Sequence, residues 1–228
     1  MPLAWLWSVV AFACDSEAEE AIRRFRTASR SPEVRARAAA VAELGRIQHD
    51  KTLAKLLSVL GTDDKAVRIA AAQAVGGFKD WRKQATSGLL AALAPNARLP
   101  EVQAAIFAAV AALGDESALP AIHAAFREKD ARVAQAAIEA TGTVRSAASI
   151  DPLLALLKDL EKFMKNTQPG GYEGPSGVGD EAEQQQRLKS LHDAAIKAIQ
   201  SITKDSWTTL EEWQIWWKRR KATFKVEK

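Results

Sequence analysis

A ten-residue pattern of valine, alanine and glycine recurs about every 33 residues, and it constrains the fold more than any other feature of the sequence. Residues 67–76 (VRIAAAQAVG) and 133–142 (VAQAAIEATG) share one Val, three Ala and one Gly at the same offsets. Val34 and Val102 open two further copies, so that successive valines are 33, 35 and 31 residues apart. A fixed period of this length is the signature of a repeat array. The sequence therefore predicts tandem copies of one small structural unit.

The repeated units are predicted to be helical. Between residues 17 and 162 apolar residues recur at three- and four-residue spacing, and no alternating strand pattern is found. Alanine supplies most of the 47% hydrophobic share, while aromatic residues make up only 7%. We therefore expect an all-α fold of short, closely packed helices, with a helix near residues 17–27 capping the N-terminal end.

The second halves of the copies are also alike, since residues 44–53 (LGRIQHDKTL) are similar to residues 113–122 (LGDESALPAI). Together these patterns resemble the HEAT-repeat family, in particular its short bacterial HEAT-like units, from about residue 31 to 160. The resemblance implies a right-handed α-solenoid of helix pairs. Ser31, Asp63 and Asp130 are expected to cap the first helices, and the glycine of each copy is expected to end its helix at a positive φ.

Residues 163–180 are predicted to form a flexible loop because they are rich in Gly and Pro. Helical spacing resumes at residue 181, and residues 213–218 (WQIWWK) resemble the end of exported bacterial HEAT-repeat proteins. The resemblance implies a C-terminal capping helix. Four tryptophans are expected to cover the open end of the last repeat, rather than to form an aromatic binding surface: Trp207, Trp213, Trp216 and Trp217.

The first 13 residues carry no charge and have the length of the apolar core of a signal peptide. They end in Ala11-Phe12-Ala13, directly before Cys14. This segment resembles a bacterial lipoprotein leader, which implies a lipid on Cys14 and a location at the periplasm or cell envelope. The alternative is an apolar capping helix in a cytoplasmic protein, with an inert cysteine. The predicted division is residues 1–13 as leader, 14–162 as repeats with their cap helix, 163–180 as loop and 181–228 as the last two helices.

Candidates for chemical reactivity are few. Cys14 is the only cysteine, so an intramolecular disulfide or a structural zinc cluster is excluded. His49, His123 and His192 lack the spacing of a helical metal site, and the glycine-rich segment lacks the ending of a phosphate loop. No nucleophile motif is found. The sequence predicts a non-enzyme without a metal, a cofactor or a small-molecule substrate.

We therefore expect a monomeric scaffold that binds a protein or peptide partner, with Tyr172, Arg35 and Arg68 as candidate contacts. Arg68 has a second interpretation, as a hydrogen-bonding residue between repeats. Two other functions stay open. The pI of about 9.2 and the basic stretch of residues 23–37 are compatible with a nucleic-acid-binding protein like the HEAT-like DNA glycosylases. The short repeat is also shared by HEAT-like phycobilin lyase subunits.

Overall fold

The structure is a computed structural model that describes residues 3–166 and 178–227, and every regular element in these ranges is a helix. The chain divides into two compact units, Met1–Asp115 and Glu116–Lys228. The boundary between the two units lies inside the region of residues 14–162 that was predicted as one array of repeats. In such an array each repeat contacts mainly its neighbours, so a boundary can fall between any two repeats. Within the described ranges, no helix is both long and apolar enough to cross a membrane.

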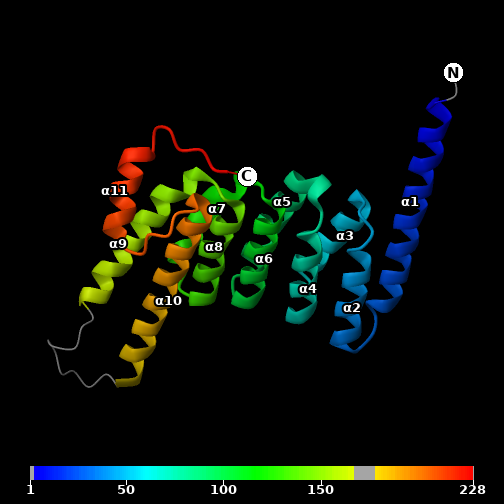
Figure 1. Cartoon of the computed structure of the whole chain (residues 1–228). Coiled ribbons are helices and arrows are strands. Elements are labelled where there is room, and N and C mark those ends of the chain that lie inside the picture. Colours follow the sequence, from blue (N-terminus) through cyan, green and yellow to red (C-terminus); the bar gives the residue numbers. More distant parts are fainter. Residues whose placement is uncertain (1–2, 167–177, 228) are drawn as a thin grey trace. The chain divides into compact units, whose positions relative to one another are not determined.

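The first unit consists of stacked helix pairs behind one long N-terminal helix (Figure 1). α2, α4 and α6 pack side by side as one layer, and α3 and α5 form the second layer. The core between the layers contains fully buried side chains such as Leu53, Val67, Phe78 and Ile106. The helices are α1 (Leu3–Ala28), α2 (Val34–Leu44), α3 (Asp50–Val59), α4 (Lys65–Val75), α5 (Arg82–Ala91) and α6 (Pro100–Leu113), with short 3-10 turns at Lys79–Trp81 and Ala94–Asn96.

The second unit repeats this arrangement (Figure 1). α8 and α10 lie side by side, while α9 packs on α10 and α11 packs on α9. Ile138, Ile150 and Ile199 are fully buried between these helices. The helices are α7 (Leu119–Ala124), α8 (Ala131–Val144), α9 (Ile150–Asn166), α10 (Val178–Thr203) and α11 (Leu210–Arg220), with 3-10 turns at Glu116–Ala118, Ala125–Arg127 and Ala147–Ser149.

The all-α prediction is confirmed, but the repeats extend further than the sequence indicated. Ala198 follows Leu191 by seven residues, as Ala74 follows Val67, and it packs against Gly142 of α8. α10 is therefore the first helix of a fifth repeat, and α11 is its second helix. The pattern was hidden because Leu191 replaces the opening valine and because residues 163–180 interrupt the period.

Gly45 and Gly76 end α2 and α4 as expected, but the positive φ expected at these glycines was wrong. Gly45 and Gly76 have ordinary right-handed helical conformations, with φ of −65° and −59°. A Cβ on Gly45 would lie 2.7 Å from the Cβ of Ala74, and one on Gly76 would lie 3.1 Å from the Cα of Ala109. Glycine is required at these positions because the first helix of the following repeat packs directly on them. In the described residues a positive φ occurs instead at Gly114, Arg145 and Lys204.

The predicted helix caps are corrected at two positions. The side chain of Asp130 accepts a hydrogen bond from the Arg132 N–H, so this cap is confirmed. α4 is capped by Asp64 instead of Asp63, and α2 begins after Glu33, which makes no capping bond with its side chain. Asp63 is engaged by Arg37 of the preceding repeat.

The boundaries of the predicted loop also change. α9 continues to Asn166 and α10 begins at Val178, so both ends of the 163–180 segment are helical. The charged and amide-bearing residues near these ends favour helix more than the neighbouring glycines suggested. Residues 167–177, including the candidate contact Tyr172, lie outside the residues that the structure describes.

Candidate partner-binding groove

A groove of about 600 Å³ runs between α8 and α10 of the second unit. Its floor is made of small residues, Gly142 on α8 and Ala194 and Ala198 on α10, because the two helices are in close contact there. Longer polar and charged side chains form the walls: Gln135, Glu139, Thr143, Gln186, Lys189, Ser190, Asp193, Lys197 and Ser201.

Part of the wall is held in place by hydrogen bonds. Ser190 Oγ donates to Gln135 Oε1 at 3.1 Å, and Gln135 Nε2 donates to Glu139 Oε1 at 2.8 Å. Ser201 Oγ donates to the Gly142 carbonyl at 2.7 Å, which ties the end of α10 to α8. The groove therefore presents side-chain amides and hydroxyls on two helices that are fixed relative to each other.

The charges of the groove are mixed in sign. Lys189, Asp193 and Lys197 follow each other at four-residue spacing on α10, so they share one helix face. Glu139 lies across the groove on α8. Such a surface suits the main chain of an extended peptide with polar side chains of both signs, and it offers no nucleophile with an adjacent base.

Arg68, a predicted partner contact, is used between repeats instead. Its Nε donates to the Asp63 carbonyl at 2.6 Å and its Nη1 donates to Asn96 Oδ1 at 2.9 Å. Asn96 is fully buried and donates through Nδ2 to the carbonyls of Leu60 and Ala92. This geometry supports the interpretation of Arg68 as a hydrogen-bonding residue between repeats.

Arg35, the second predicted contact, is exposed on α2 but is not the counterpart of Arg68. Gly45 lies nine residues after Ala36, as Gly76 lies nine residues after Val67, so Arg37 takes the position of Arg68. Arg37 donates to Asp63 Oδ1 at 3.0 Å, and its side chain is only 17% exposed. The register assumed from Val34 was wrong by two residues.

Three of the four predicted capping tryptophans are buried on α11. Trp213, Trp216 and Trp217 are at most 8% exposed, and Phe224 packs edge-on against Trp216 and Trp217. Trp217 Nε1 donates to Asp151 Oδ1 on α9 at 2.9 Å. Trp207 does not belong to this cluster, because it precedes α11 and is 42% exposed.

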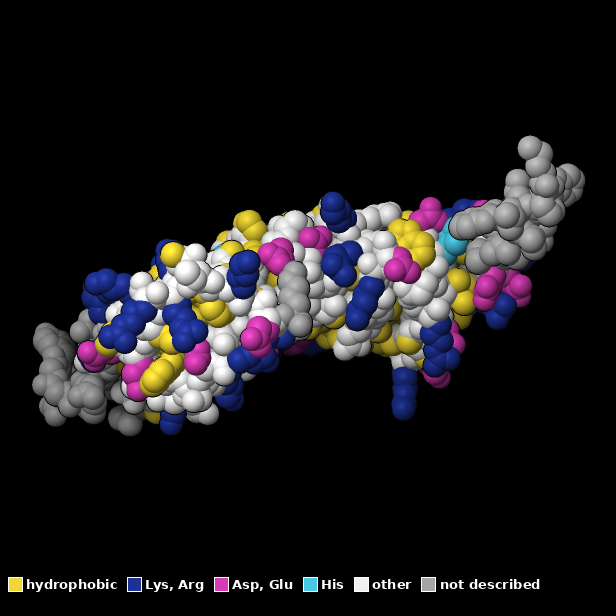
Figure 2. Space-filling view, turned by 45° about the horizontal axis from the view of Figure 1, so that its top comes forward, with side chains coloured by type: hydrophobic (Ala, Val, Ile, Leu, Met, Phe, Trp, Pro, Cys, Tyr) yellow, Lys and Arg dark blue, Asp and Glu magenta, His cyan; other side chains and the backbone are white. Residues whose placement is uncertain are grey.

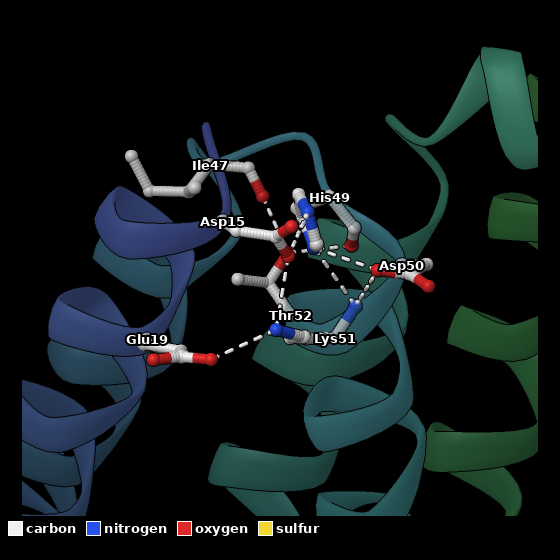
Figure 3. Close-up of polar contacts among 7 residues, drawn as sticks. All are labelled: Asp15, Glu19, Ile47, His49, Asp50, Lys51 and Thr52. Carbon is white, nitrogen blue, oxygen red and sulfur yellow. Dashed lines mark hydrogen bonds and ion pairs between the residues drawn. The ribbon is translucent and has the colours of Figure 1, made fainter. Parts of the chain in front are cut away.

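A polar cluster fixes α1 to the start of α3 (Figure 3). Lys51 Nζ lies 2.9 Å from Asp15 and 2.8 Å from Glu19, and His49 Nε2 lies 3.4 Å from Asp15. The hydrogen bond and charge of Lys51, with a smaller effect from His49, lower the pKa of Asp15, while the hydrogen bonds that Lys51 donates to Glu19 and Asp15 raise the pKa of Lys51. In the described ranges no group of three His, Cys, Asp or Glu side chains could hold a metal ion. The ion pairs of the cluster join α1 to the start of α3.

The side chain of Cys14, the predicted lipidation site, lies outside the described residues, although its backbone belongs to α1.

The stacked helix pairs and their repeated glycine–alanine contacts define a helical-repeat protein. The sequence model of HEAT repeats matches residues 22–99 and 86–165. The chain belongs to the HEAT-repeat family, whose members are commonly scaffolds for protein interactions. A search of curated proteins gave no match. The α8–α10 groove was not predicted from the sequence, although the spacing of Leu191, Ala194, Ala195 and Ala198 carries the signal for it.

Proposed function

We propose that this protein is a non-enzymatic scaffold, exported and anchored at the cell envelope through a lipid on Cys14, which binds an extended segment of a partner protein in the α8–α10 groove. The observation that carries the binding proposal is the groove itself. It combines a floor of small residues with fixed amide and hydroxyl groups, which can pair with a peptide backbone.

The anchoring proposal is supported by the length of α1. This helix has 26 residues, whereas α2 and α3, on which it packs, have 11 and 10. At a rise of about 1.5 Å per residue, α1 is more than twice as long as either neighbour. Its N-terminal half extends past their ends (Figure 1). Cleavage before Cys14 would leave residues 14–28 as a helix closer in length to its neighbours, and this helix would begin next to Asp15, the first residue of the polar cluster.

The nucleic-acid alternative has less support. Two arginines of the basic stretch are occupied, since Arg24 pairs with Glu20 at 2.7 Å and Arg37 pairs with Asp63. The groove contains acidic as well as basic side chains, whereas binding to phosphates is driven by net positive charge.

Photo-crosslinking tests the binding proposal. A photoreactive amino acid at Gln186 or Lys197 is expected to capture the same protein from intact cells, while one at Lys158, which is exposed on α9, captures none. Reversing the groove charges with Lys189→Glu and Lys197→Glu should abolish capture from position 186. The matched reversal Lys129→Glu and Lys158→Glu, on exposed residues elsewhere in the unit, should leave it unchanged. Equal capture from all positions, or capture insensitive to the groove reversal, would contradict the proposal.

A further inference from the structure

The exposed face of α11 carries a cationic and apolar surface. Ile215 is 47% exposed, and Lys218 and Arg219 flank it on the helix because they follow it by three and four residues. Arg220 follows Ile215 by five residues, which turns it away from this face, and it lines a pocket with Lys225, Asp205 and Glu227. Figure 2 shows several Lys and Arg side chains in the region of α11, with Asp and Glu side chains among them. We call residues 215, 218 and 219 the α11 surface.

These cations differ from their neighbour Lys221. Lys221 Nζ lies 2.9 Å from Asp151 Oδ2 and 6.0 Å from the ring centre of Trp217, so its charge is used within the fold. Within the described residues, Lys218 and Arg219 form no ion pair. Their charge is therefore available to an external anionic partner.

The α11 surface is held rigidly. Behind it, Trp213 and Trp216 pack edge-on with ring centres 5.7 Å apart, and the indole N–H of Trp217 donates a hydrogen bond to Asp151. A capping box between Thr209 and Glu212 fixes the start of the helix. It also turns Glu212 toward the backbone. The acid left on the exposed face is Glu211, which lies at the opposite end of α11 from the cations.

We propose that the α11 surface binds the anionic surface of a phospholipid bilayer. Phosphate recognition alone would need only cations, but this surface also exposes an aliphatic side chain between two of them. Three large apolar side chains are exposed in the described chain. Ile215 is one of them, and Trp207, in the segment directly before α11, is a second. An exposed Ile between Lys and Arg is typical of protein surfaces that sit in the bilayer interface, where cations meet anionic headgroups, and Trp207 adds apolar area at the other end of the helix. Ile215 offers no ring on which a nucleic-acid base could stack.

Vesicle flotation tests this proposal with the full chain carrying Cys14→Ser, so that the result does not depend on lipidation. The variant is expected to bind vesicles of two parts phosphatidylcholine to one part phosphatidylglycerol, and to bind pure phosphatidylcholine vesicles much more weakly. Lys218→Glu with Arg219→Glu should reduce binding about tenfold or more, since each cation near an anionic surface strengthens binding about fivefold. Ile215→Ser should reduce it severalfold without a change of charge.

The matched control is Lys129→Glu with Lys158→Glu, which changes the net charge equally and should leave binding unchanged. Circular dichroism and thermal unfolding verify that each variant is folded. Equal binding to both kinds of vesicle, equal loss in the control variant, or unchanged binding of Ile215→Ser would overturn the proposal. Tighter binding of a DNA duplex than of the anionic vesicles, lost in the same α11 variant, would identify the surface as a nucleic-acid site and overturn it too.

Discussion

At the repeat junctions within each unit, a glycine on one first helix packs against an alanine on the next. Gly45 faces Ala74, Gly76 faces Ala109 and Gly142 faces Ala198. Larger side chains at these positions would separate the helices and open cavities in the layer. The high alanine content and the scarcity of aromatic residues in the repeats follow from this close contact.

Gly76→Val is expected to lower the free energy of unfolding by about 2 kcal/mol, because the new side chain would overlap Ala109. Gly61→Val is the matched control, since a Cβ on Gly61 meets no atom within 4 Å. It should change stability by less than about 0.5 kcal/mol. Urea denaturation of both variants measures the difference. Equal effects would show that helix contact is not the reason for Gly76.

The hydrogen bond that Arg68 donates to Asn96 leads to a second prediction. Arg68→Ala would leave the buried Asn96 Oδ1 without its donor and should cost about 1–3 kcal/mol of stability. Arg35→Ala removes an exposed arginine and should be nearly neutral. Denaturation curves again provide the measurement, and a neutral Arg68→Ala would refute the role of Arg68 in joining repeats.

Among the helices, those with the strongest period were predicted best. α4 and α8 begin and end close to the segments that the repeat pattern marks, because their buried Val and Ala positions are spaced by the helix turn. The repeat period could not locate the start of α2 accurately. When the two helices are aligned on their glycines, Val67 of α4 corresponds to Ala36 of α2, and Val34 corresponds to Lys65, two residues earlier. The period also missed that α10 and α11 form a repeat, since an insertion separates them from α9. Glycine identity alone could not distinguish close helix contact from a positive φ.

α11 is attached to α9 partly through Asp151. Burial raises the pKa of Asp151, but the hydrogen bonds from Lys221 and Trp217 and the charge of Lys221 outweigh it, so that the pKa lies below its usual value. A carboxyl whose pKa is lower in the folded state stabilises the fold above its unfolded pKa of about 3.9, and this stabilisation is lost as the pH falls through the folded value.

Asp151→Asn is therefore expected to reduce stability near neutral pH by up to about 1 kcal/mol, a small value because the side chain is 55% exposed. The difference from the unmodified protein should vanish in strong acid. Tryptophan fluorescence during denaturation at several pH values measures it, with Asp80→Asn, at an exposed position, as the control. A difference that stays constant with pH would show that the charge of Asp151 does not stabilise α11.

For the whole molecule, the repeat pattern determines the internal contacts but leaves the outer positions of the helices unconstrained. Glu139, Lys189 and Lys197 of the groove and Ile215 of the α11 surface occupy such outer positions, where the pattern requires no particular residue. The fold could therefore be predicted from the sequence, whereas the groove could be found only once α8 and α10 were seen to be adjacent. Cys14 is the exception, because its signal lies in the linear sequence before it.

The intact mass of the protein from the membrane fraction of its native cells tests the envelope-anchored scaffold most directly. The account predicts a chain that begins at Cys14, lacks residues 1–13 and carries the added mass of a lipid on its first residue. A Cys14→Ser variant should lose that mass and leave the membrane fraction, unless the α11 surface retains it, in which case high salt should release it. An unmodified chain that retains residues 1–13 and occurs in the cytosol would contradict the account.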